Sequence, residues 1–264
     1  MLLYKLVSNN FSRYLRNIFN VKPTISYKPK YDNSPISDFF FWEETNKMHT
    51  KFFLTNLASQ VLPDIKQTDS IKIYIYDKKG ILLKELLYKL DYLETLEIDF
   101  SKLGLSSYGS FFVFHKFKDS NELISKKSHI ADRGYISYSD DSFFWKYMHG
   151  NNYAAYENQI NGNINSIMTK TFKKYKYTPQ VSFNDCKNFD IILNNPGIQS
   201  ISVEIRAFIK NHNISKKIIL ENKSTSKISF EHKEIKYIEI ISNFLMFRPV
   251  IIKKYNSDFD IFHG

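Results

Sequence analysis

The sequence contains one cysteine, Cys186, among its 264 residues. A single cysteine excludes an intramolecular disulfide, a Cys-x-x-Cys redox pair and a zinc site built from several thiolates. Glycine is also scarce, with eight residues, and neither Gly-x-Gly-x-x-Gly nor the Walker A pattern occurs. The common nucleotide-binding folds use such patterns to hold phosphates. We therefore expect no cofactor, no metal and a reducing, cytoplasmic location.

Long hydrophobic runs are absent as well, since no segment approaches the roughly 20 apolar residues that a membrane span needs. On a helical wheel, residues 1–21 have one apolar side, with Lys5, Arg13 and Arg16 on the opposite side. This pattern predicts a basic amphipathic helix, which either packs on protein or binds an anionic membrane surface peripherally. The three prolines in residues 22–35 predict an extended connector.

Arginine is scarce although the formal net charge is +10. Of 37 basic residues, five are arginines and 32 are lysines, and the lysines form no dense run. Arginine is the preferred residue for bidentate contacts to phosphate and guanine. We therefore do not expect a nucleic-acid partner.

Four sequence blocks recur in the same order in the two halves of the chain. Each block consists of short runs rich in Ile, Tyr, Phe and Val, separated by polar turns every eight to twelve residues. This spacing is typical of antiparallel strands. The matched blocks are Phe52–Leu57 with Asp190–Pro196, Ser70–Leu87 with Val203–Leu220, Leu93–Phe100 with Ser224–Phe230, and Arg133–Gly150 with Arg248–Gly264.

The repeat predicts an all-β protein with two tandem, internally duplicated antiparallel β-sandwich domains, at residues 36–150 and 175–264. Residues 151–174 are expected to form a linker with a short helix near Ile164 to Lys173. The order strand, Asn-containing turn, strand, Asp-Lys-Lys-Gly hairpin and Leu-rich strand resembles immunoglobulin-like and fibronectin-like sandwiches, which recur as adhesion and accessory modules. The resemblance implies an architecture but no site residues, because the Cys…Trp…Cys framework is absent.

The two halves differ by an insertion in the first, which runs from His115 to Asp132. Insertions in a duplicated scaffold form loops, and loops on rigid sheets often carry binding sites. The insertion and the block after it also hold the densest collection of polar and aromatic groups in the chain. We therefore predict a site formed by His115, His129, Asp132, Arg133, Tyr135, Tyr138, Asp141, Trp145 and His149.

Enzymatic chemistry has weak support in this region. His129, Asp132 and His149 could ligate a metal, but their spacing is not specific, and turn or strand-face roles are favoured. No Gly-x-Ser-x-Gly pattern supports a Ser-His-Asp arrangement. The adjacent carboxylates at 43–44 and 140–141 do not form a glycosidase pair, because neighbouring strand residues point to opposite faces.

A shallow binding surface is the remaining interpretation. Trp145, Tyr135 and Tyr138 offer flat aromatic groups beside hydrogen-bonding side chains, which suits sugars or an extended peptide, although a core role for the aromatics is the simpler alternative. We expect a non-enzymatic binding or accessory protein that recognises a glycan or cell-envelope polymer, or a protein partner, through the insertion. The alternatives are a carbohydrate-active enzyme with its site between His115 and His149, and a scaffold attached to a membrane by residues 1–21.

One further pattern concerns the ends of the last matched blocks. Arg133 and Arg248 begin equivalent strands, and His149 and His263 end them. We interpret these residues as structural groups that fasten strand ends to carboxylates. In the alternative interpretation, the two histidines flank a groove between the domains.

Overall fold

The structure is a computed structural model that describes residues 35–64, 66–118, 134–140, 144–158, 162–167, 170–183, 185–210, 212–231, 235–244 and 248–264. The predicted amino-terminal helix and nearly all of the connector that follows it lie outside these ranges. Within the ranges, no helix is both long enough and apolar enough to cross a bilayer.

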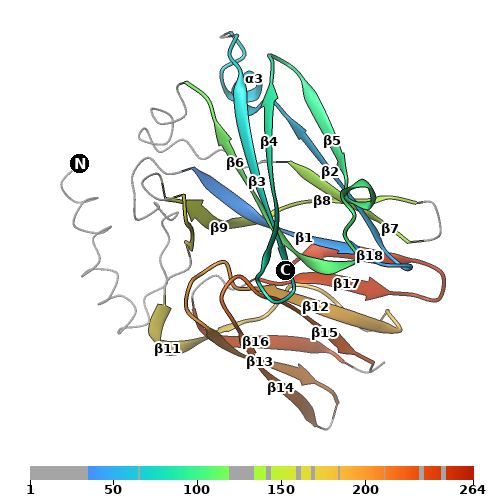
Figure 1. Ribbon diagram of the computed structural model, residues 1–264. Coiled ribbons are helices and arrows are strands. Elements are labelled where there is room, and N and C mark those ends of the chain that lie inside the picture. Colours follow the sequence, from blue (N-terminus) through green and yellow to red (C-terminus); the bar gives the residue numbers. More distant parts are fainter. Residues whose placement is uncertain are drawn as a thin grey trace.

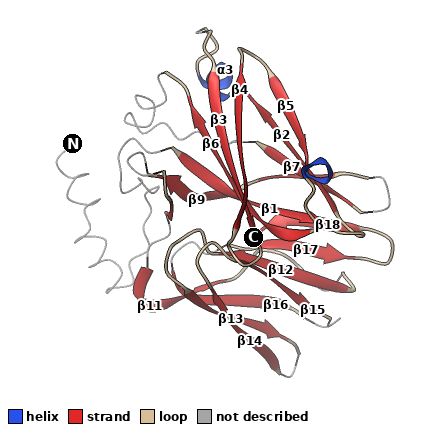
Figure 2. Cartoon of the chain, viewed as in Figure 1, coloured by secondary structure: helices blue, strands red, loops and turns tan. Residues whose placement is uncertain are grey.

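The described chain is built almost entirely from strands, as Figures 1 and 2 show. These residues form four antiparallel sheets, which we number 1 to 4. Sheet 1 has the order β10 (Ile164–Ser166), β9 (Asn151–Glu157), β1 (Ile36–Glu44), β6 (Ser107–Lys116), β3 (Asp69–Asp77) and β4 (Leu82–Leu90). Sheet 2 has the order β5 (Thr95–Asp99), β2 (His49–Thr55), β7 (Tyr135–Ser139) and β8 (Lys146–His149).

The second half of the chain forms the other two sheets and begins at β11. Sheet 3 has the order β15 (Thr225–Phe230), β12 (Asn188–Asn194), β17 (Val250–Lys254) and β18 (Phe259–His263). Sheet 4 has the order β11 (Lys170–Tyr177), β16 (Tyr237–Phe244), β13 (Ile201–Phe208) and β14 (Asn213–Leu220). Two short helices accompany the strands in the described ranges, α3 (Leu57–Val61) and the 3-10 helix η1 (Phe100–Leu103).

The strand order is the same in the two halves. Sheet 2 (β5-β2-β7-β8) corresponds strand by strand to sheet 3 (β15-β12-β17-β18), and the β1-β6-β3-β4 part of sheet 1 corresponds to sheet 4. The four sequence blocks that recur in the two halves lie on these corresponding strands.

A buried asparagine occupies the same place in each half. The Nδ2 group of Asn56 donates toward the carbonyl oxygens of Gln67, Leu90 and Asp91 at 2.9 to 3.0 Å. The Nδ2 group of Asn195 donates in the same way to the carbonyl oxygens of three residues at 2.7 to 3.1 Å. The three acceptors of Asn195 are the carbonyl oxygens of Gln199, Leu220 and Glu221. Each amide therefore ties the end of one strand to the end of a neighbouring hairpin.

The prediction of two immunoglobulin-like sandwich domains is wrong. The sheets are arranged like the blades of a four-bladed β-propeller. Sheet 3 explains the difference, because both of its faces are covered: Ile192 packs in the hydrophobic core of the first half, whereas Ile191 packs in that of the second. On β17, Val250 likewise packs in the core of the first half and Ile251 in that of the second. Two independent sandwiches would leave the outer face of this sheet in water.

The described residues of the segment expected to hold a short helix, near 164–173, lie in or beside strands. Residues 164–166 are β10, and β11 begins at Lys170. Strands β9 and β10 extend sheet 1 beside β1, where Ile164 joins the core of the first half. This core, rather than local helix propensity, decides the conformation of the segment. The predicted domain limits themselves remain a prediction.

The two halves meet through hydrogen bonds as well as apolar contacts. The backbone N–H of Thr225 donates to the carbonyl oxygen of Lys78 at 3.0 Å. The Nδ2 group of Asn194 donates to the Ser110 hydroxyl at 3.0 Å. A Cβ on Gly80 would lie 2.1 Å from the carbonyl oxygen of Asn222, so the β3–β4 turn fits against the second half without room for a side chain.

Candidate functional site

The predicted site residues that the structure describes do not converge on one place. His129, Asp132, Arg133 and Asp141 lie outside the described residues. The other five occupy three separate environments: the core, the contact between the halves, and an exposed sheet face. Each environment allows different chemistry.

His115, on β6, is part of a buried pair. Its Nδ1 atom lies 2.7 Å from Oδ2 of Asp69, which also accepts the backbone N–H of Leu57 at 2.9 Å. The His115 and Asp69 side chains are 3% and 0% exposed. A carboxylate at Nδ1 fixes the orientation of an imidazole, but a ring this deeply buried offers no surface to a large ligand. The pair ties β3, β6 and the start of α3 together.

Tyr138, on β7, belongs to the hydrophobic core. Its ring is fully buried, and its hydroxyl donates to the carbonyl oxygen of Phe41 at 2.6 Å. Burial raises the pKa of Tyr138 well above its ordinary value. The core alternative therefore describes this tyrosine, and it takes no part in a binding surface.

His149 and His263 contact each other where β8 meets β18. Their Nε2 atoms are 2.8 Å apart, and Nδ1 of His149 lies 3.0 Å from the carbonyl oxygen of Gly150. If His149 donates from Nδ1, its Nε2 accepts the N–H of His263. The expected carboxylate partners are replaced by this bond between equivalent histidines. Close by, Nδ2 of Asn151 donates to the carbonyl oxygen of Arg248 at 2.9 Å.

The histidine pair is expected to make stability depend on pH. Burial lowers the pKa of His263, and the charges of His149 and Arg248 lower it further. A lowered folded-state pKa means that the unfolded chain binds more protons, so stability falls as the pH drops through the ordinary histidine value of about 6.5. Urea unfolding between pH 7.5 and 5.5 measures this slope, which His263→Gln should reduce. An equal slope in the variant would contradict the assignment.

An exposed aromatic surface covers the face of sheet 2 that points away from the core. We define it as Phe53, Tyr135, Trp145 and Tyr147. Phe53 pairs in register with Tyr135, and their neighbour Tyr147 has its ring centroid 5.9 Å from that of Phe53. The Nζ atom of Lys51 lies 5.1 Å from the Trp145 ring centroid. Tyr135 and Tyr147 are 49% and 60% exposed, so large aromatic groups face solvent here.

A hollow of about 450 Å³ adjoins one end of the aromatic surface. Phe53 and Tyr135 form part of its wall, together with the polar side chains of Thr55, Gln60 and Glu97. Glu97 also forms an ion pair with Lys51, whose Nζ atom lies 2.7 Å from Oε1 of Glu97. Aromatic rings and hydrogen-bonding groups therefore lie side by side.

The corresponding face of sheet 3 is buried. Ile192 pairs with Val250 in sheet 3, just as Phe53 pairs with Tyr135 at the corresponding position of sheet 2. Both Ile192 and Val250 are fully buried in the core of the first half. The same strand position is thus aliphatic where a neighbouring sheet covers it, and aromatic where it faces solvent.

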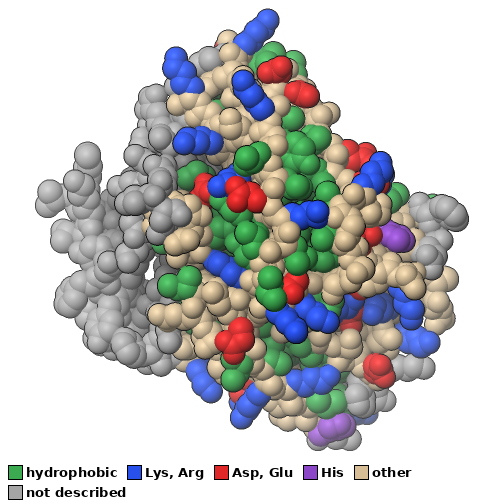
Figure 3. Space-filling model, viewed as in Figure 1, with side chains coloured by type: hydrophobic (Ala, Val, Ile, Leu, Met, Phe, Trp, Pro, Cys, Tyr) green, Lys and Arg blue, Asp and Glu red, His purple; other side chains and the backbone are tan. Residues whose placement is uncertain are grey.

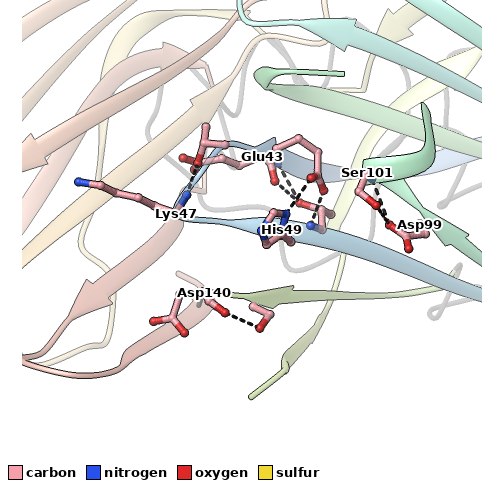
Figure 4. Close-up of polar contacts among 10 residues, drawn as sticks. Glu43, Lys47, His49, Asp99, Ser101 and Asp140 are labelled. Atoms are coloured by element: carbon pink, nitrogen blue, oxygen red, sulfur yellow. Dashed lines mark hydrogen bonds and ion pairs between the residues drawn. The ribbon is translucent and has the colours of Figure 1, made fainter. Parts of the chain in front are cut away.

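A larger cleft of about 1180 Å³ lies between the halves. The turn between β1 and β2 contributes Asn46 and Lys47, and the turn between β17 and β18 contributes Asn256 and Ser257. Asp140, which follows β7, also lines it. Figure 4 shows the first-half side of this region, with Lys47 and Asp140 on segments next to His49.

Two lysines that line the cleft are paired with buried carboxylates. Lys227 lies 2.6 Å from Glu43 and 3.5 Å from Asp190, and Lys254 lies 2.7 Å from Asp190. Burial alone would raise the pKa of Asp190, but Lys254, the Ser229 hydroxyl and Lys227 outweigh it and hold that pKa below its ordinary value. These two lysines and two carboxylates together therefore carry little net charge.

The two adjacent glutamates of β1 have different partners, as the alternation of a strand requires. Glu43 bonds to Lys227 across the halves. Glu44 accepts the backbone N–H of Thr50 at 2.7 Å and lies 3.1 Å from Nδ1 of His49. Burial raises the pKa of Glu44 although these bonds oppose the shift. Glu44 therefore stabilises the β1–β2 hairpin and Glu43 stabilises the contact between the halves, so the two carboxylates are not paired at one site.

Charged side chains do not gather into a basic patch on the face in Figure 3, where lysines are interspersed with acidic groups. In the ranges that the structure describes, no group of three His, Cys, Asp or Glu side chains is placed to hold a metal ion. No protein-family model matches the chain, and no curated protein sequence matches it significantly. The fold therefore defines the class of the protein, an all-β chain of propeller-like sheets.

Proposed function

We propose that the protein is a non-enzymatic binding protein that recognises a glycan through the aromatic surface and the adjoining hollow. One observation carries the proposal: Phe53, Tyr135 and Tyr147 lie together on a sheet face that is open to solvent. Exposed apolar groups of this kind on a soluble protein often mark an interaction site.

The chemistry of the surface favours a sugar over an apolar partner. Aromatic rings pack against the apolar faces of sugar rings, while nearby polar groups exchange hydrogen bonds with the hydroxyls. Gln60, Thr55 and Glu97 supply such groups around the hollow. Lys51 is neutralised by Glu97, so the surface does not select strongly for ligand charge.

The rival class is a carbohydrate-active enzyme with acid and base groups between His115 and His149. Such an enzyme needs the reacting side chains to approach one substrate atom. His115 is instead engaged with Asp69 in the core, and His149 is engaged with His263. These contacts favour binding over catalysis for the described part of the region.

A glycan array followed by isothermal titration tests the proposal. Tyr135→Ala is expected to weaken binding of the selected glycan about tenfold, because it removes one exposed aromatic contact. Tyr237→Ala is the matched control, since Tyr237 is 40% exposed but lies on sheet 4. If the protein binds no glycan on the array, or if Tyr135→Ala binds the selected glycan as tightly as the unchanged protein does, the proposal is wrong.

A further inference from the structure

We infer that the ligand is an extended, uncharged polysaccharide chain that runs along sheet 2 from the hollow to the cleft between the halves. The inference rests on the proposed function and specifies its substrate class. It follows from the position of the two concavities at opposite ends of the same strands, from a hydroxyl between them that has no hydrogen-bond partner among the described residues, and from the presence of both charge signs in the cleft.

Strand β2 connects the two concavities. Its alternate side chains, His49, Lys51, Phe53 and Thr55, share the face that points away from the core. Phe53 and Thr55 line the hollow, whereas His49 contacts Glu44, which lines the cleft. At about 3.3 Å per residue, the six steps from Thr55 to His49 span about 20 Å. This distance is longer than one sugar ring.

Strand β7 follows the same course beside β2. Tyr135 lines the hollow, and Asp140, just beyond the other end, lines the cleft. Between them Ser137 faces outward, because Ile136 and Tyr138 pack in the core. Ser137 is fully buried, yet its hydroxyl has no hydrogen-bond partner among the described residues. It lies opposite Tyr147, so movement of that ring would offer the hydroxyl to a ligand.

The cleft favours an uncharged chain. Two of its lysines, Lys227 and Lys254, are paired with the carboxylates of Glu43 and Asp190. The exposed turns offer amide and hydroxyl groups from Asn46, Asn256 and Ser257, beside charged groups of both signs, Lys47 and Asp258. Amide and hydroxyl groups suit the hydroxyls of a neutral sugar, and neighbouring charges of both signs give a ligand of one charge no net attraction.

Isothermal titration with neutral oligosaccharides of two and six units tests the inference, using the chito-, cello-, malto- and xylo- series and the full chain. In the series that binds, the hexamer is expected to bind at least tenfold more tightly than the dimer. A cleft variant, Asn46→Ala with Asn256→Ala, should remove most of this difference and leave dimer affinity unchanged. Both residues are exposed in turns, and Ser257→Ala provides a second, independent cleft variant.

The outcomes separate the two proposals. If dimer and hexamer bind equally, or if the cleft variants keep the full hexamer affinity, the extended-chain inference is wrong and glycan binding stands. If no oligosaccharide of either length binds and the array is blank, the proposed function itself is wrong. Asn165→Ala, at a partly exposed asparagine of β10, is the matched control and should change neither affinity.

Discussion

Replacement of Asn56 by alanine is expected to lower the free energy of unfolding by about 4 kcal/mol. The substitution leaves the carbonyl oxygens of Gln67, Leu90 and Asp91 without their amide donor in a buried site. It also removes the N-cap of α3, where the Asn56 side chain accepts the backbone N–H of Ser59 at 2.9 Å. Chemical denaturation monitored by circular dichroism measures the loss.

The repeated architecture supplies its own comparison. Asn195→Ala should cost a similar amount, since its amide makes the corresponding three contacts in the second half. Asn165→Ala should change the stability by less than about 0.5 kcal/mol, because that side chain bonds a carbonyl oxygen near the surface. A small effect at Asn56 would show that the three carbonyl oxygens find other donors.

Replacement of Lys227 by methionine is expected to cost about 3 kcal/mol near neutral pH. The lysine lies between the carboxylates of Glu43 and Asp190, both nearly fully buried, and its removal leaves Glu43 without this partner. The methionine keeps most of the side-chain volume, so the loss reports the charge rather than a cavity. Urea titration at several pH values measures the effect.

The effect of Lys227→Met should diminish in acid. Because the folded-state pKa of Asp190 is lowered, its ion pairs contribute stability above about pH 4 and lose it as the pH falls through the folded value. Protonated carboxyls no longer need the ammonium group. Lys51→Met is the control, since its partner Glu97 is about half exposed, and it should cost at most about 1 kcal/mol. A pH-independent loss at Lys227 would contradict the ion-pair explanation.

The sequence allowed the strands to be predicted better than their assembly. The blocks around Asn56 and Asn195 lie on β2 and β12 and continue into equivalent hydrogen bonds. An alternation of apolar and polar residues along a strand, however, does not indicate which element packs on the apolar face of the sheet. Ile191, Ile192 and Leu193 are consecutive apolar residues, a pattern typical of a strand covered on both faces, and the structure buries all three. That signal was available and argues against a free sandwich face.

The candidate site was predictable only in part. Tyr135 and Tyr138 are three positions apart, so a strand places them on opposite faces, and the structure exposes the first and buries the second. Phe53 and Tyr147 escaped the sequence analysis because cross-strand register brings them together. The bond between His149 and His263 depends on how the halves meet, which no local pattern encodes.

The double coverage of sheet 3 has a consequence for how the molecule loses its structure. Ile191 and Ile192 are neighbours on one strand, yet each supports a different core. Opening that strand therefore exposes apolar surface in both halves at once, and neither half can open alone at low cost. The described chain should behave as one cooperative unit in unfolding, with sheet 3 as the element that couples the halves.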